Sequence, residues 1–104
     1  MPTITTNGIR QNYELTGSGE TTMVWIHGIG SSLEYWSNDL EQFKNLQHLS
    51  YDVRGMGNSE GTPDAVSLEI WAQDLSMLLE SLDIEKSIIA GSSMGGAIAQ
   101  RFAI

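Results

Sequence analysis

A short glycine-rich turn lies between a predicted strand and a predicted helix near the end of this chain. Its residues are Gly91-Ser92-Ser93-Met94-Gly95-Gly96. The apolar run 87–90 precedes the turn and the helical stretch 97–104 follows it, which is the context that a nucleophile elbow requires. So sharp a turn forces its central serine into a strained, left-handed backbone, and the residues two positions away must lack bulk. Gly91 and Gly95 meet that condition, so Ser93 is expected to be exposed at a helix N-terminus, although a plain Gly/Ser-rich loop would also fit this motif alone.

Two apolar runs upstream have the pattern of buried parallel strands, and each is followed by a loop of distinctive composition. Residues 23–26 precede the loop 27–32, which begins His-Gly-Ile-Gly. Residues 48–51 precede the loop 52–59, whose sequence is Asp-Val-Arg-Gly-Met-Gly-Asn-Ser. Together with the Gly-x-Ser-x-Gly turn, these loops closely resemble the three motifs of the α/β-hydrolase superfamily, in that family's order and spacing. The resemblance is to serine hydrolases of the esterase, lactonase and haloperoxidase kind.

The resemblance implies an α/β fold, namely half of an α/β-hydrolase sheet with helices on both faces. An antiparallel hairpin would come first, and segments 3–6 and 9–15 have its alternating pattern on either side of the turn signal Asn7-Gly8. Parallel strands would follow, giving the strand order 1-2-4-3-5. The match covers nearly all of residues 1–104 as a single domain, but only the N-terminal half of such an enzyme core, with no cap domain and no later strands. All three loops should then meet at the carboxyl edge of the sheet, where ligands bind in such folds.

Two helices are predicted between the strands. Apolar residues at spacings of four and three within 36–43 indicate one amphipathic helix. The clearest apolar stripe runs from Leu68 to Leu82, with Ser67 placed as the N-cap and Glu69 in the first turn, where a carboxylate suits the helix dipole. Asp83 follows this helix and can adopt the left-handed conformation that ends it.

The resemblance assigns roles by position. Ser93 matches the nucleophile that forms an acyl-enzyme. The backbone N–H groups of Met94 and Ile29 match the two donors of the oxyanion hole, which stabilise the charged oxygen of a tetrahedral intermediate. Gly28 and Gly30 would keep the second donor's loop close to the substrate.

Asp52 and Arg54 match the family's loop after the second parallel strand, and we expect them to support the loop, with Arg54 pairing with carboxylates to fix the turn. Asp52 has little support as the triad acid, because an acid must orient a base and none is visible beside it. In the family, the triad acid and histidine come after later strands, in the order Ser, Asp or Glu, His. Ser93 is therefore expected to lack the base that normally activates it.

The sequence contains two histidines. His48 lies four residues before Asp52, roughly 13 Å down an extended strand from the catalytic edge, and is not expected to reach Ser93. His27 ends the strand that should neighbour the one before the elbow, so its ring could approach Ser93 as a surrogate base. The resemblance favours a different role for His27, because the family uses this position to support the oxyanion loop.

Composition excludes several other classes of function. Thirteen acidic and five basic side chains give a net charge of −8, and the basic residues are scattered, which argues against a nucleic-acid or anionic-membrane surface. With no cysteine and two isolated histidines, no metal site is expected. Leu33 and Glu60 stand where the third glycine of a dinucleotide-binding pattern belongs, so no cofactor is expected. No signal-peptide pattern or membrane-spanning run is visible, so a cytoplasmic location is the default expectation.

These observations predict a serine-hydrolase fragment that acts on small carboxylic esters or related acyl compounds through a Ser93 acyl-enzyme. Activity of this chain alone is expected to be weak, because the triad Asp and His are absent from it. The alternative is a non-catalytic folding or interaction module that has only inherited the elbow's geometry. The strand 87–90 would normally lie inside the sheet, so its exposed edge predicts a homo-oligomer, formed by that edge or by exchange of the terminal helix.

Overall fold

A computed structural model of the chain describes residues 2–28, 30–36, 40, 43, 45–61 and 67–103. The elements, in chain order, are β1 (Thr3–Thr6), β2 (Ile9–Gly17), β3 (Thr22–Ile26), the 3₁₀-helix η1 (Leu33–Trp36), β4 (Gln47–Tyr51), α1 (Leu68–Ser81), β5 (Ser87–Gly91) and α2 (Met94–Ala103). Among these described residues, no helix has the length and apolar character needed to cross a membrane.

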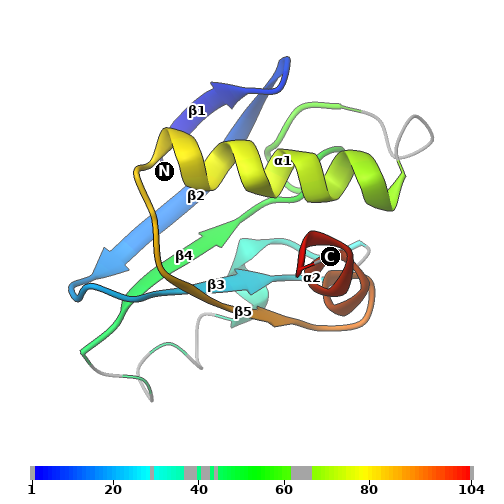
Figure 1. Cartoon of the computed structure of the whole chain (residues 1–104). Helices are drawn as coiled ribbons and strands as arrows, with labels where there is room; N and C mark the ends of the chain where they lie inside the picture. The colour runs from blue at the N-terminus through cyan, green and yellow to red at the C-terminus, as the bar shows by residue number, and fades with distance from the viewer. Residues whose placement is uncertain are drawn as a thin grey trace.

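The five strands form one sheet in the order β1-β2-β4-β3-β5, which confirms the predicted topology (Figure 1). β2 pairs antiparallel with β1 and with β4, whereas β3 pairs parallel with both β4 and β5. The register places Ile26 opposite Tyr51 on one side and Gly91 on the other. The loops that follow these three residues therefore leave the same edge of the sheet, as the sequence predicted.

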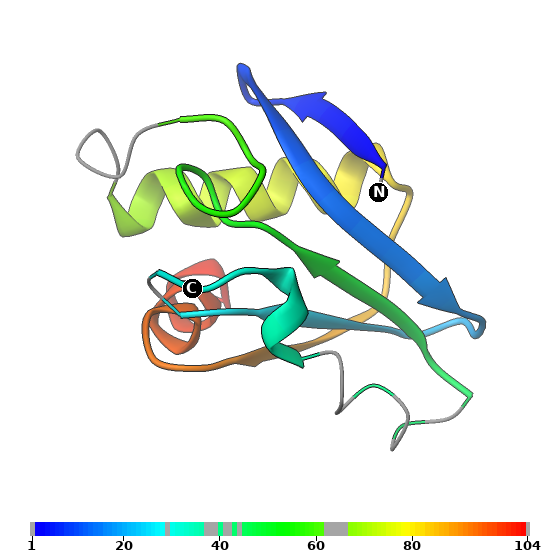
Figure 2. The ribbon, with the colours of Figure 1, turned by 180° about the vertical axis from the view of Figure 1, so that it is seen from behind.

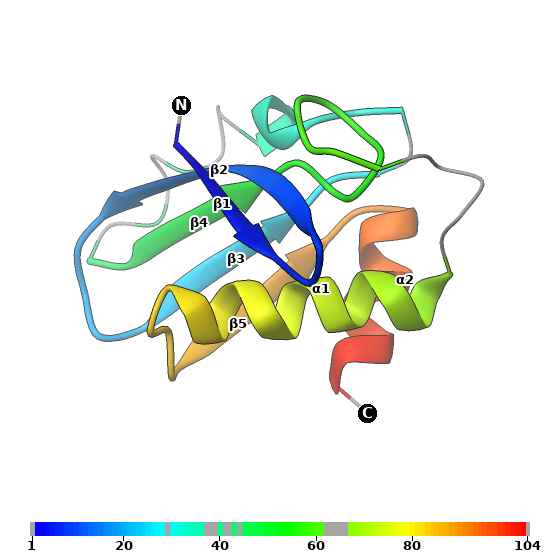
Figure 3. The ribbon, with the colours of Figure 1, turned by 90° about the horizontal axis from the view of Figure 1, so that it is seen from above.

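Both α-helices lie on one face of the sheet (Figures 1 and 3). The main apolar core lies between the sheet and these helices. Val24 and Ile26 on β3 and Leu49 on β4 are fully buried there. Leu75 of α1 and Ile98 of α2 belong to the same cluster and are also fully buried. The helices thus hold the ends of β3 and β5 in a fixed relation, which is what positions the elbow.

η1 lies over the opposite face of the sheet (Figure 2). Aromatic rings from β3, η1 and Phe43 cluster there. The Trp25 ring centroid on β3 lies 4.9 Å from that of Trp36 and 5.6 Å from that of Phe43. The Trp25 indole N–H also donates to His48 Nδ1 at 3.1 Å. Helical elements therefore lie on both faces, although the one on this face is short.

Local sequence signals account for the predicted turns and caps. Asn7 and Gly8 both have positive φ, of 50° and 81°, as a tight hairpin requires. Ser67 caps α1, because its Oγ accepts from the Ile70 N–H at 3.2 Å. Asp83 has φ 58° after the end of α1, so it adopts the predicted left-handed conformation.

The helix predicted over 36–43 differs from the structure at its start. The described part is η1, a 3₁₀-helix that begins at Leu33, and residues 37–39, 41 and 42 lie outside the described part. The tight turn has a long-range cause, because the Leu33 N–H donates to the Asp52 carboxylate at 2.7 Å. The Tyr35 N–H then bonds the Ser32 carbonyl at 3.1 Å, the short spacing of a 3₁₀ turn.

Candidate active site

Ser93 lies at the sharp turn between β5 and α2. Its φ is 55°, the left-handed region that a serine rarely adopts, and the residue is exposed. The N–H groups of Gly96 and Ala97 donate to the Ser93 carbonyl at 2.9 and 3.2 Å, so the helix starts directly from the strained residue. The Ser93 hydroxyl has no partner among the residues that the structure describes. This geometry presents an unbonded hydroxyl at a helix N-terminus.

The two glycines of the motif are required by close backbone contacts. A Cβ at Gly91 would clash with the carbonyl group of Gly95. A Cβ at Gly95 would clash in turn with the carbonyl oxygen of Ile26, at the end of β3. The elbow can therefore close against its own helix and against β3 only because both positions lack side chains.

The His-Gly loop after β3 lies close to Ser93. A Cβ at Gly28 would be 3.5 Å from Ser93 Cβ and 4.0 Å from Ser93 Oγ. On the other side, the Met94 N–H has no partner in the part of the chain that the structure describes, so it is free to donate to a ligand. Ile29, the other residue matched to the oxyanion hole, lies outside the described residues. Gly30 is described as exposed, with φ 75°.

His27 is fully buried and both of its ring nitrogens are engaged. The Val53 N–H donates to His27 Nε2 at 3.0 Å, so that nitrogen is unprotonated. The proton is therefore on Nδ1, which lies 2.7 Å from the Gly28 carbonyl oxygen and donates to it. The ring joins the two loops, and this arrangement offers no support for His27 as a surrogate base for Ser93.

His48 lies on β4, buried in the aromatic cluster. Its Nδ1 accepts the indole N–H of Trp25, so Nε2 carries the proton and donates to the Phe43 carbonyl at 2.8 Å. Both nitrogens are again used, on the strand that the sequence predicted for this residue. Neither histidine of this sequence therefore has a ring nitrogen available for proton transfer.

The Asp52 carboxylate is buried and ties three segments together. It accepts hydrogen bonds from Leu33 N at 2.7 Å, Asn58 N at 2.8 Å and Asn12 Nδ2 at 3.0 Å. A Cβ at Gly57, whose φ is 53°, would collide with this carboxylate, which explains the glycine there. Neither histidine ring is hydrogen-bonded to Asp52, so its geometry is that of a structural anchor for η1 and the loop after β4.

Arg54 forms a bidentate ion pair with Asp74 of α1. Arg54 Nε and Nη2 each lie 2.8 Å from an Asp74 carboxylate oxygen, and Nη2 also donates to the Asn7 carbonyl at 3.0 Å. The hydrogen bond with Asp74 raises the pKa of Arg54 above its usual value. The side chain of Asn7 completes the cluster by donating to Asp74 at 2.8 Å. Sequence reasoning anticipated a carboxylate partner for Arg54 but not that α1 and the first hairpin would supply the cluster.

Tyr35 is a neighbour of the elbow that sequence reasoning missed. It lies on η1 with 55% of its surface exposed, and its hydroxyl lies 3.5 Å from Ser92 Oγ. The sequence carried no specific signal, because a tyrosine beside Trp36 looks like one more aromatic residue of an amphipathic helix.

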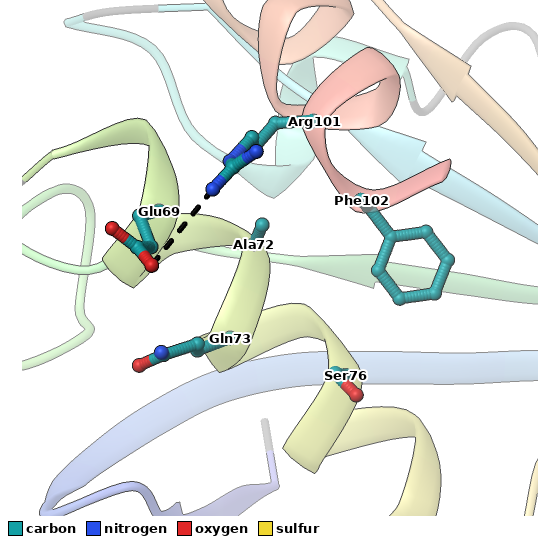
Figure 4. A pocket seen from close by; sticks show the side chains of 6 residues that line it. All are labelled: Glu69, Ala72, Gln73, Ser76, Arg101 and Phe102. Carbon is teal, nitrogen blue, oxygen red and sulfur yellow. Dashed lines mark ion pairs between the residues drawn. The ribbon is translucent and has the colours of Figure 1, made fainter. Parts of the chain in front are cut away.

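A groove of about 370 Å³ between α1 and α2 lies elsewhere (Figure 4). It is lined by Glu69, Ala72, Gln73, Ser76, Arg101 and Phe102. Arg101 is seven residues beyond the start of α2, about 10 Å along the helix from the elbow. The groove is therefore separate from Ser93.

Within the described ranges, no three His, Asp or Glu side chains are grouped as metal ligands.

The site thus combines an exposed, strained serine after β5 with the backbone of the loop after β3, supported by the anchored loop after β4. Residues 21–104 match the sequence model of the alpha/beta hydrolase fold family. The chain belongs to the α/β-hydrolase family.

Several α/β hydrolases are similar to this chain. The 2-hydroxymuconate semialdehyde hydrolase of Pseudomonas sp. (strain CF600) is 34% identical over 102 residues, covering 93% of this chain and 36% of the relative. A thermophilic esterase from Thermogutta terrifontis is 32% identical with a TM-score of 0.85, covering 97% of this chain and 38% of that structure. The enol-lactonase of Burkholderia xenovorans LB400 is 27% identical with a TM-score of 0.88, covering 93% and 39%. The chain therefore spans less than half the length of each of these three proteins.

Proposed function

We propose that this chain carries the nucleophile and oxyanion-hole part of a serine hydrolase for carboxylic esters or related acyl compounds. The observation that carries the proposal is the exposed Ser93 at φ 55° with the backbone of Gly28 packed against it. In the proposed reaction, Ser93 Oγ attacks the ester carbonyl carbon and the bond to the alcohol oxygen breaks. The Ser93 proton leaves with that oxygen or passes to water, and water later cleaves the acyl-Ser93 ester to release the acid.

The site is suited to stabilise the negative charge that develops during ester hydrolysis. The tetrahedral intermediate carries its charge on one oxygen, and the free Met94 N–H at the N-terminus of α2 is suited to stabilise it. By resemblance, the N–H of Ile29 would be the second donor. Serine at position 93 fits an acyl-enzyme, and the similarity to an esterase and an enol-lactonase supports ester chemistry.

The chain alone should be a slow catalyst. Both histidine rings are fully hydrogen-bonded, so neither of them is available to take the Ser93 proton. Loss of triad members in serine proteases costs about 10⁴- to 10⁶-fold in turnover, while binding and the oxyanion hole alone leave roughly 10³- to 10⁴-fold over water. We therefore expect slow hydrolysis of activated p-nitrophenyl esters, whose leaving group needs no general acid, and none of alkyl esters.

The test is hydrolysis of p-nitrophenyl butyrate by the purified chain and its Ser93→Ala variant. Hydrolysis above buffer should disappear in the variant, and mass spectrometry of the parent should find a butyryl group on the peptide that contains Ser93. Ser81→Ala, at the end of α1, is the matched control and should keep the parent rate. Equal rates for parent and Ser93→Ala, with both folded by circular dichroism, would contradict the proposal and favour a non-catalytic module.

A second candidate function, an interaction module, is favoured by one observation. β5 pairs only with β3 among the described strands, and Ile88 on β5 is 48% exposed. None of the five β5 residues is buried, whereas four of five on β3 are. An edge strand with unpaired backbone groups beside apolar surface recruits another strand. We propose that two copies associate through this edge or by exchange of α2.

A two-fold dimer that pairs β5 with β5 must be antiparallel, which sends the two elbows to opposite ends of the joined sheet. Light scattering at micromolar concentration should give the mass of a dimer. Ile88→Lys should shift it toward monomer if the edge is used, whereas helix exchange would resist this substitution. A compact monomer for the parent chain would contradict association by either route.

A further inference from the structure

Two hydroxyl groups from distant parts of the chain meet beside the nucleophile. Tyr35 Oη and Ser92 Oγ lie 3.5 Å apart, although 57 positions separate them in sequence. Ser92 directly precedes Ser93, so one of the two hydroxyls belongs to the sequence neighbour of the proposed reacting residue.

Tyr35 is held in place although its side chain is half exposed. The Tyr35 ring meets Trp36 edge to face, with centroids 5.0 Å apart at 87°. Trp36 in turn packs on Trp25 at 4.9 Å, so the tyrosine is backed by the aromatic cluster. The hydrogen bond from the Leu33 N–H to the buried Asp52 carboxylate fixes the start of η1. The phenol is therefore positioned by two successive ring contacts and an anchored backbone, while half of the residue remains exposed.

Ser92 is fixed by the sheet. Its N–H donates to the Ile26 carbonyl at 3.2 Å, and its own carbonyl accepts from the Gly95 N–H at 2.8 Å. Both hydroxyls are thus presented by anchored backbone, which lowers the entropic cost of ordering them around a ligand.

Among the described residues, the contact between the two hydroxyls leaves most of their hydrogen-bonding capacity unused. Strong O–H···O bonds are about 2.7–2.8 Å long, so 3.5 Å is at the weak limit. Each hydroxyl has one donor and two acceptor positions. An acceptor oxygen placed between Tyr35 and Ser92 could receive a hydrogen bond from both.

We infer that Tyr35 and Ser92 form a polar subsite beside Ser93 that binds an oxygen atom carried on the acyl chain of the substrate. The inference rests on the proposed function, since the acyl group must be held at Ser93. It makes the preferred substrates oxygenated acyl compounds, such as esters of alkoxy, hydroxy or oxo acids. Tyr35 is here a specificity residue, and the bond-breaking step remains with Ser93.

The first test compares p-nitrophenyl methoxyacetate with p-nitrophenyl butyrate. The two acyl groups have the same length, and an ether oxygen replaces one methylene. Each rate is divided by the rate of the same ester in buffer, because the ether oxygen changes intrinsic reactivity. One neutral hydrogen bond to the substrate should raise this relative rate by about 2- to 12-fold. The parent should therefore prefer the methoxyacetate by about 5-fold. Tyr35→Phe and Ser92→Ala should each bring the ratio toward 1.

Tyr13→Phe is the matched control, because Tyr13 lies on β2 against the core on the helical face and should keep the parent ratio. Circular dichroism melts should show that the three variants are folded. An unchanged preference in Tyr35→Phe, or no preference in an active parent, would overturn the inference while leaving the proposed function intact.

A binding measurement separates the two proposals. Methyl methoxyacetate and methyl butyrate are unactivated esters that the chain should not cleave, and binding near Tyr35 should change the fluorescence of Trp36. Titration of the Ser93→Ala variant should show tighter binding of the methoxy ester, lost when Tyr35→Phe is added. If the parent has no Ser93-dependent hydrolysis but this preference is present, the proposed function fails and the subsite stands. Equal binding of the two esters would overturn the subsite.

Discussion

The loop after β4 and the turn after β5 leave the same edge of the sheet, but they differ in the burial and hydrogen bonding of their polar groups. In the first, the buried Asp52 carboxylate accepts three hydrogen bonds, and Arg54 is paired with Asp74. In the second, Ser93 is exposed in a left-handed conformation, and its hydroxyl has no partner among the described residues. The first loop is held in place by its hydrogen bonds, whereas the second leaves a hydroxyl exposed.

This difference shows that rigid segments support the conformation of one strained residue. A strained residue persists only where the surrounding structure determines its conformation, and strain of this kind costs of order 1–3 kcal/mol. Here the surroundings are the close glycine contacts of the turn and the anchored loops beside it. Substitutions in the supporting parts should therefore change stability, whereas substitutions at Ser93 should change chemistry.

The largest effect is expected at Gly95. Alanine there would place a Cβ into the Ile26 carbonyl, and neither backbone can move without opening the elbow. We expect Gly95→Ala to lower the free energy of unfolding by at least about 3 kcal/mol. The matched control is Gly96→Ala, whose added Cβ has its nearest contact at 3.6 Å. In a helix this change should stabilise by about 0.5–1 kcal/mol. Urea unfolding followed by circular dichroism measures both, and equal stability of the two variants would contradict the steric account.

Asp52→Ala should be nearly as damaging. The substitution leaves the Leu33 N–H and the Asn12 amide without their acceptor in a buried place, and each orphaned donor costs about 1–3 kcal/mol. We expect a loss of about 3 kcal/mol in the same urea experiment, whereas Glu80→Ala on the exposed side of α1 should stay within about 0.5 kcal/mol. A small effect of Asp52→Ala would mean that the loop after β4 does not support the site.

Ser93→Gly tests the strain in the turn itself. Glycine adopts positive φ without a steric penalty, so the variant should be more stable than the parent by about 1 kcal/mol, while hydrolysis disappears with the hydroxyl. Ser93→Ala keeps the strain and should have the stability of the parent. A loss of stability in Ser93→Gly would show that the left-handed conformation is not strained in this chain.

Tyr51→Phe should have the smallest effect at neutral pH and a clear one in alkali. Tyr51 ends β4, and its hydroxyl is buried with no partner among the described residues, in contrast to Asp52 beside it. Burial, helped by the charge of Asp74, raises the pKa of Tyr51. Above the ordinary tyrosine pKa of about 10, Tyr51 therefore keeps its proton in the folded state but loses it in the unfolded state. The contribution of Tyr51 to the free energy of unfolding is full below that pH and falls as the pH rises above it.

The measurement for Tyr51→Phe is urea unfolding at pH 7 and at pH 10.5–11.5. The variant should equal or slightly exceed the parent at pH 7, because an orphaned hydroxyl has been removed. It should lose less stability in alkali than the parent, while Tyr13→Phe should follow the parent curve. The same alkaline slope in Tyr51→Phe and parent would contradict the raised pKa.

Much of the fold was predictable from the sequence because it depends on neighbours along the chain. Gly91 and Gly95 around Ser93 predicted the elbow, since a left-handed turn tolerates little else. Asn7-Gly8 predicted the hairpin, and Ser67 predicted the start of α1. The order of three motifs, by resemblance to α/β hydrolases, then predicted the strand order that the sheet shows.

Contacts between distant segments were decided only by the tertiary structure. The sequence left His27 open as a base, but packing of the loops after β3 and β4 gives both of its ring nitrogens partners. The pairing of Arg54 with Asp74 and the approach of Tyr35 to Ser92 likewise depend on where whole elements are placed. Local sterics fix the conformation of a turn from a few residues, whereas the partner of a side chain is fixed by the path of the entire chain. For that reason the sequence determined which residue is presented at the elbow, and the fold determined which groups surround it.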